Sequence, residues 1–319
     1  MLLIKPSGLL PFIKSPSLSV SNPAMNISHL LRRYEQGHRN FPKLNLTGED
    51  LSRAMLISVN LTQSNLMGIN LSRGFLTKSN LNQASLNWGN LTYAKMSESQ
   101  LIETDLTKAD LTGAFMVKSV LINAKLGGAN LSYTNLRAAD LSYANCCGAN
   151  LREINLREAN LQGVNFNWAN LSQARLSCTN LQQASFFGTN LSGTFIKEVD
   201  LSNTDFEQAN FRESHLCYSS LQGANLQGAN LQGATLRYSS LRGANLRGAN
   251  LRDTDLEGAD LTHAVIENAD FTNAKFSDTK VIQTNLKSPT TIYNSSESKL
   301  KHNLNRLSSL ELLHADIAV

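Results

Sequence analysis

The sequence of 319 residues predicts an all-β solenoid, in which the chain winds into a stack of similar coils. Three observations carry this prediction. Apolar residues recur at every fifth position, small and polar residues keep fixed places around them, and the series is unbroken from Phe41 to Leu286, which gives (286 − 41)/5 + 1 = 50 positions. A period of five matches neither an α-helix nor a β-strand, so it excludes ordinary globular folds.

Each apolar residue, called the centre here, stands in the same local pattern. A small residue precedes it by two positions, Asn or Asp usually precedes it by one, and a pair of polar residues or Gly follows. In an extended chain, the small residue and the centre point to one side and the Asn or Asp points to the other. The polar pair then turns the chain, and Gly at its second place, as at Gly163, suits a type II turn. We expect another turn type where this place holds a bulky residue, as at Trp88, Tyr93, Trp168 and Tyr218.

Four such turns give a square coil of about 20 residues that rises about 4.8 Å to the next coil. Fifty repeats divided by four predict about 12 coils and a rod roughly 60 Å long. A single coil buries too few centres to offset the conformational entropy of its chain, so only stacking makes the fold stable.

The run from Leu221 to Thr235, which repeats Leu-Gln-Gly-Ala-Asn, resembles the pentapeptide-repeat family, whose motif is A(D/N)LXX. On this pattern the resemblance covers residues 41–287 and implies a right-handed quadrilateral β-helix. Residues 30–41 are also similar to the lead-in of cyanobacterial members, among them a regulator of heterocyst differentiation. That similarity implies a developmental role with a protein partner, such as a transcription regulator.

The ends of the chain depart from the repeat. We expect residues 1–24 to be a disordered tail, because Pro6, Pro11 and Pro16 interrupt its apolar runs. Residues 25–40 predict a capping helix and lead-in, with Ser28 as the N-cap and Gly37 just past the helix end. Residues 288–319 predict a linker and a C-terminal helix that either caps the rod or forms an end-to-end dimer.

Charge and cysteine content limit the possible functions. Residues 41–287 hold 21 Lys or Arg and 21 Asp or Glu, so the rod is neutral. A nucleic-acid-binding protein would show a basic stripe, and a DNA mimic would show an acidic face. Cys146, a centre, is expected to be buried, and the four Cys suit neither a disulfide nor a metal site, so we expect a reducing, cytoplasmic compartment. No apolar run is long enough to cross a membrane.

Residues 20 apart stack in columns, and two of the outward columns before the centre differ sharply. One contains only Asn or Asp from Asp50 to Asp270, which predicts a side-chain ladder bonded to the backbone. The other is called the divergent column here. It consists of Met55, Phe75, Lys95, Phe115, Asn135, Asn155, Arg175, Phe195, His215, Thr235, Asp255 and Lys275.

Apolar and cationic side chains on one side of a rod are typical of a protein-binding patch. The candidate binding residues come from the divergent column and from the residues after the adjacent centres. They are Met55, Ile57, Phe75, Lys95, Phe115, Val117, Arg137, Arg157, Arg175, Phe195, Lys197 and His215. The alternative is local packing, in which the aromatic rings lie along neighbouring coils in place of the Asn ladder.

No catalytic motif, cofactor loop or metal-ligand spacing occurs, and a convex rod without inserted loops lacks a cleft, so we expect no enzyme activity. The sequence instead favours a scaffold or regulator that binds a protein partner on one face. The alternative is topoisomerase protection, since some members of the family protect DNA gyrase by resembling DNA.

Overall fold

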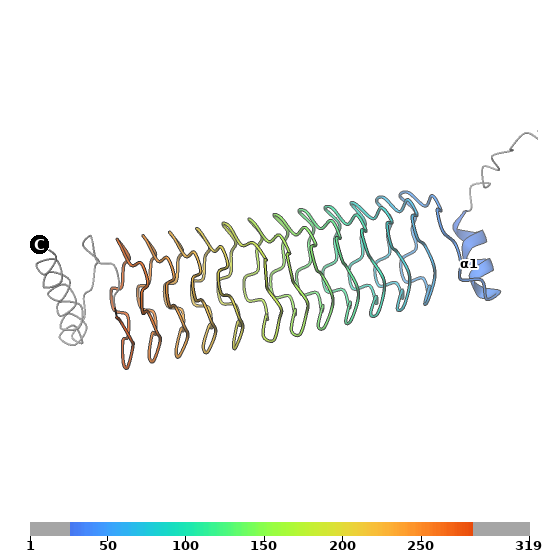
Figure 1. The fold of residues 1–319 in the computed structure, drawn as a ribbon. Helices are drawn as coiled ribbons and strands as arrows, with labels where there is room; N and C mark the ends of the chain where they lie inside the picture. The colour runs from blue at the N-terminus through green and yellow to red at the C-terminus, as the bar shows by residue number, and fades with distance from the viewer. Residues whose placement is uncertain (1–25, 283–319) are drawn as a thin grey trace, which may run out of the picture.

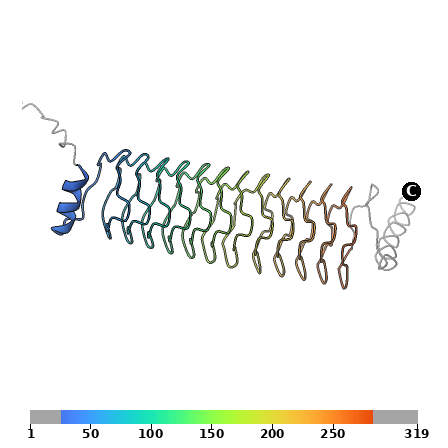
Figure 2. The same ribbon diagram turned by 180° about the vertical axis from the view of Figure 1, so that it is seen from behind.

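The computed structural model describes residues 26–282, which form a straight rod of stacked coils with one helix at its N-terminal end (Figure 1). Residues twenty apart pair as single parallel bridges, for example Asn40 with Asn60 and Asn45 with Asn65. The bridging residue is always the one before a centre, so each coil offers one bridge on each of four faces. Figure 2 shows the same regular stack from behind. The predicted β-helix is therefore confirmed, as a ladder of isolated bridges without longer strands in this range.

All corners of the rod share one backbone conformation. Every fifth residue from Lys43 to Asp278 has a φ between 56° and 69°, whether it is Gly or not. The prediction of another turn type at Trp88, Tyr93, Trp168 and Tyr218 is wrong, because their φ values of 57° to 63° match those of the glycines. Stacking explains this, since most corner N–H groups are held by a carbonyl of the next coil, such as Thr107 O for Trp88 N at 3.1 Å.

The core is a continuous column of centres and small residues. The Leu centres are almost completely buried, and the small residue two positions before most centres is buried beside them. Phe166, Phe186 and Phe206 stack inside the rod, with ring centroids 5.2 and 4.9 Å apart. Cys146 is buried as expected, and all four cysteines are free thiols. Burial raises the pKa of the Cys146 thiol to about 12.

The Asn and Asp column forms the expected ladder. The Asn170 amide donates to Asn150 Oδ1 at 3.3 Å and accepts from the Asn190 amide at 3.1 Å. The same Asn170 oxygen also accepts the backbone N–H of Ser172. Amide-to-amide bonds of this kind run from Asn130 to Asn250 and join the neighbouring coils of that range, a structural role.

Helix α1, Ile27–Glu35, covers the first coil. Leu30 is fully buried in the rod's core cluster, and the Tyr34 hydroxyl donates to Ile57 O at 2.9 Å. The predicted N-cap Ser28 is wrong, because Asn26 takes this place and accepts the N–H of His29 at 2.9 Å. An N-cap side chain accepts the N–H of the third helical residue. The helix begins at Ile27, so its third residue is His29 and its N-cap is Asn26, whereas Ser28 already lies inside the helix. Gly37 follows the C-cap with a φ of 94°, as predicted.

The stack has one interruption among the described coils, between Asn180 and Asp200, which no bridge joins. The turn at Lys197 also lacks the backbone hydrogen bond that closes most other turns, which here would join Val199 N–H to Ile196 O. The buried hydroxyl of Ser219, from the next coil, replaces this bond by accepting Val199 N–H at 3.2 Å and donating to Ile196 O at 2.7 Å.

Some expectations stay predictions. The tail over residues 1–24 and the C-terminal helix within 288–319 lie outside the described residues. The right-handed winding of the coils remains an expectation that the resemblance implies. The coil number also remains a prediction, since the repeats continue past the described range.

Candidate functional site

The divergent column keeps the backbone pairing of the rest of the rod. Phe75 bridges Lys95, and Lys95 bridges Phe115, in the same parallel manner as the Asn residues of other columns. Its apolar side chains stay accessible, with exposed fractions of 61% for Met55, 38% for Phe75 and 42% for Phe115. The departures from the repeat therefore change the surface of the rod and leave its coils paired.

The N-terminal part of the column forms a shallow depression of about 490 Å³, called the first hollow here. It is lined by Arg53, Arg73, Phe75, Tyr93, Lys95 and Phe115. The Lys95 ammonium lies 4.2 Å from the centre of the Phe115 ring, and the Arg73 guanidinium lies 5.9 Å from the Tyr93 ring. The hollow thus combines aromatic rings with cations that lie against them.

Three residues of the first hollow escaped the sequence reasoning. Arg53, Arg73 and Tyr93 occupy the corner column that precedes the divergent column by two residues. The signal that could have found them is their own stacking, since they are also 20 residues apart. A corner residue and the next outward residue flank the same inward-pointing small side chain, so their side chains meet over it.

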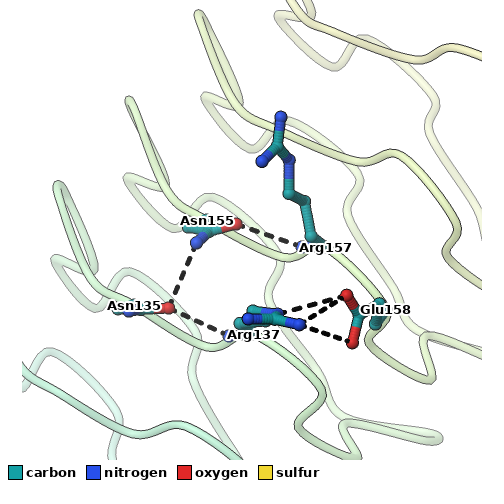
Figure 3. Close-up of polar contacts among 5 residues, drawn as sticks. All are labelled: Asn135, Arg137, Asn155, Arg157 and Glu158. Atoms are coloured by element: carbon teal, nitrogen blue, oxygen red, sulfur yellow. Dashed lines mark hydrogen bonds and ion pairs between the residues drawn. The ribbon is translucent and has the colours of Figure 1, made fainter.

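In the middle of the column the consensus returns (Figure 3). The Asn155 amide donates to Asn135 Oδ1 at 3.2 Å. Asn135 Oδ1 also accepts the backbone N–H of Arg137, and Asn155 Oδ1 accepts that of Arg157. Arg137 forms a two-pronged ion pair with Glu158, at 2.9 Å for its shortest contact, whereas Arg157 points away from both. This short Asn ladder lies between the first hollow and a second depression, which Asn155 also lines.

The second hollow, of about 710 Å³, follows the ladder. Phe195 and His215 stack in it, with ring centroids 4.8 Å apart and planes 23° apart. Its lining is more polar than that of the first hollow. It consists of Glu153, Asn155, Gln173, Arg175, Gly193, Phe195, Glu213, His215 and Gly233.

The structure does not bring all candidates together. Phe75, Lys95 and Phe115 line the first hollow, and Arg175, Phe195 and His215 line the second. The remaining candidates line neither hollow and lie beside them. They are Met55, Ile57, Val117, Arg137, Arg157 and Lys197.

The Lys197 ammonium lies 3.1 Å from Glu198, and the hydrogen bond between them raises the pKa of Lys197. Because Glu198 already neutralises its charge, Lys197 would attract an acidic partner less strongly than an unpaired cation would.

Over residues 26–282, no group of three or more His, Cys, Asp or Glu is placed to hold a metal ion. In the same range, no helix has the length and apolarity needed to cross a membrane.

Comparisons with known proteins agree with the repeat. The sequence model of the family described as pentapeptide repeats matches stretches between residues 40 and 287. HetL, a pentapeptide-repeat protein involved in heterocyst differentiation regulation in the cyanobacterium Nostoc sp. strain PCC 7120, is 32% identical. That match covers 76% of this chain and 98% of HetL, with a TM-score of 0.32.

Two further solved structures match less closely. The plasmid-mediated fluoroquinolone resistance protein QnrB1 is 22% identical over 62% of this chain and 91% of its own, with a TM-score of 0.30. Rfr23 from the cyanobacterium Cyanothece 51142 is 24% identical over 53% of this chain and 98% of its own, with a TM-score of 0.18. No curated protein matches significantly. With these TM-scores, the kinship rests on the repeat motif and on sequence identity.

Proposed function

We propose that this chain, which belongs to the pentapeptide-repeat family, is a non-catalytic scaffold that binds a protein partner along its divergent column. The observation that carries the proposal is the accessibility of Phe75, Phe115 and Phe195, whose exposed fractions are 38%, 42% and 45%. Exposed apolar side chains that share one face of a protein mark interaction sites. The paired backbone beneath them supplies a rigid platform.

The identity to HetL supports a regulatory role. HetL is described as involved in heterocyst differentiation regulation, so the proposed function is that of a cyanobacterial developmental regulator. Its partner would be a protein, such as a transcription regulator. The free thiols fit the proposed cytoplasmic location, and we propose that the rod acts as a monomer or as an end-to-end dimer.

Exchange of three phenylalanines tests the proposal. Phe75→Asn, Phe115→Asn and Phe195→Asn together restore the consensus residue without touching the core. We expect an unchanged melting temperature and loss of the partner from a quantitative crosslinking pull-down. Met67→Asn is the matched control, since it removes an exposed apolar side chain from another column. The proposal is contradicted if the triple variant still captures every protein that both the wild type and Met67→Asn capture. A triple variant that fails to fold favours the packing alternative.

Topoisomerase protection is the second candidate, and the match to QnrB1 is what raises it. The neutral rod weighs against it, because resemblance to DNA requires dense negative charge on one face. A supercoiling assay with DNA gyrase and a quinolone decides between the two. Protection of gyrase by the purified chain would support this candidate, and unchanged inhibition would remove it.

A further inference from the structure

We infer that the first hollow binds an acidic segment of the partner that also carries aliphatic side chains. This inference rests on the proposed function and adds the chemistry of the partner. It comes from three features of the described residues: the balance of charge along the column, the lack of carboxylate partners for the cations that line the hollow, and the mixed apolar lining.

The charge balance differs between the two halves of the column. The face around the first hollow consists of residues 53–58, 73–78, 93–98 and 113–118. These stretches hold five cations and one carboxylate, a net charge of 5 − 1 = +4. The equivalent stretches around the second hollow, 153–158, 173–178, 193–198 and 213–218, hold three cations and four carboxylates, which gives 3 − 4 = −1. A neutral rod therefore carries a local positive field at the first hollow.

Four of the five cations on this face have no carboxylate partner among the described residues. Lys78 lies 3.8 Å from Glu98, and no ion pair within residues 26–282 includes Arg53, Arg73, Lys95 or Lys118. Their charges are available to a partner, and charge of one sign on an interface selects the opposite sign across it.

The C-terminal coils show that the fold can neutralise such residues. Arg242 pairs with Asp260 at 3.2 Å, and Arg247 pairs with Glu267 at 2.8 Å, each in the next coil. Arg252 lies 3.6 Å from Asp270 in the same manner. These arginines directly follow a centre, whereas Arg53 and Arg73 are corner residues, for which the equivalent pair is Lys78 with Glu98, 20 positions further on. The residues 20 positions after Arg53 and Arg73 are Arg73 and Tyr93, so neither of them meets a carboxylate in that way.

The apolar lining favours a peptide over a nucleic acid. Bases bind to open aromatic faces, but Lys95 lies over the Phe115 ring and Arg73 lies toward the Tyr93 ring. Met55 and Ile57 extend the apolar surface with exposed fractions of 61% and 39%, and aliphatic side chains suit other aliphatic side chains. An acidic peptide with Leu or Ile between its carboxylates satisfies both the cations and the apolar surface.

The chain's own ends have the wrong charge for this hollow. Residues 1–25 contain Lys5 and Lys14 and no acidic residue. Residues 283–319 contain four Lys or Arg and three Asp or Glu, so they are not acidic either. A separate protein is therefore the better match.

Fluorescence anisotropy with the full chain tests the inference. The probe is a labelled peptide of about eight residues that alternates Glu and Leu, long enough to span the roughly 15 Å from Met55 to Phe115. We expect saturable binding that weakens as NaCl rises from about 0.05 to 0.5 M. A peptide with Lys for Glu, one with Ser for Leu and a single-stranded oligonucleotide should each bind at least about tenfold more weakly.

Charge variants locate the site. Arg53→Gln, Arg73→Gln and Lys95→Gln together should weaken binding of the Glu-Leu peptide at least about tenfold. Lys43→Gln, Lys125→Gln and Lys280→Gln are the matched control, because they remove the same charge from exposed positions of other columns and should change binding less than about twofold. Equal losses for both variants would mean unspecific charge attraction and would overturn the inference.

The outcome separates this inference from the proposed function. If the phenylalanine variant loses its partner in the pull-down but the acidic peptide fails to bind, the partner-binding face stands and the acidic segment is wrong. Tighter binding of the oligonucleotide than of the peptide, with the same dependence on Arg53, would assign the hollow to nucleic acid and overturn the inference. The inference would also be overturned if sedimentation showed that the chain self-associates through the hollow and the labelled peptide showed no binding in the anisotropy measurement.

Discussion

The ring of Tyr143 lies against Gly163, its stacking partner in the next coil: a methyl group added at Gly163 would come within 2.5 Å of Tyr143 Cδ1. The same relationship joins Tyr93 to Gly113 and Trp168 to Gly188. A glycine one coil after an aromatic corner residue thus gives the ring a surface to cover.

This contact predicts a specific cost for Gly163→Ala. Its φ of 66° already disfavours Ala by about 1–2 kcal/mol, and the displaced ring adds about 1–3 kcal/mol. Gly148→Ala is the control, because its φ of 64° is equivalent and no atom would lie within 4 Å of the added methyl. Chemical denaturation measures the difference, and equal losses for both variants would show that the ring moves freely.

Ser219→Ala should destabilise the interrupted part of the rod by about 1–3 kcal/mol, because it leaves the buried Val199 N–H without its acceptor. Hydrogen exchange should rise at Val199. Ser239→Ala is the matched control, since its buried hydroxyl donates to Leu236 O, which already accepts Ser239 N–H. If both variants lose the same stability, Ser219 has no special role at the turn.

Burial of Cys146 predicts a loss of stability at alkaline pH. Its pKa is raised from 9.0 to about 12, so the folded chain keeps a proton that the unfolded chain releases above pH 9. This contribution is fully present below pH 9 and falls by about 1.4 kcal/mol per pH unit towards pH 12. Denaturation of the wild type and of Cys146→Ala between pH 8 and 11 measures it as the difference in slope. Parallel curves would contradict the raised pKa.

Leu30→Ala should release α1 from the first coil, at a cost of about 2–5 kcal/mol for a fully buried leucine. Leu31→Ala, at a half-buried position of the same helix, should cost clearly less. Hydrogen exchange of the first coil reports the release through Phe41 N–H and Leu46 N–H. A rod whose first coil stays protected without Leu30 would show that the helix is dispensable as a cap.

Part of the candidate site was visible in the sequence. The column of Phe75, Lys95 and Phe115 follows from a coil of 20 residues, because stacking places equal positions above one another. Arg53 and Tyr93 do not follow from the divergent column alone, because the surface hollow forms between this column and the neighbouring corner column. The pairing state of each cation was also hidden, since ion pairs depend on side-chain reach and not on spacing alone.

The sequence by itself determined the coil, the buried centres, the Asn ladder and the face that departs from it, because a short repeat leaves few ways to bury its apolar residues. Tertiary structure alone decided the turns at bulky corners, where the next coil's carbonyls hold the backbone at positive φ even for Trp88. Tertiary structure also decided the N-cap Asn26 and the role of Ser219. A hydrogen bond forms only when the donor–acceptor distance is right to within a few tenths of an ångström, which the order of residues does not determine.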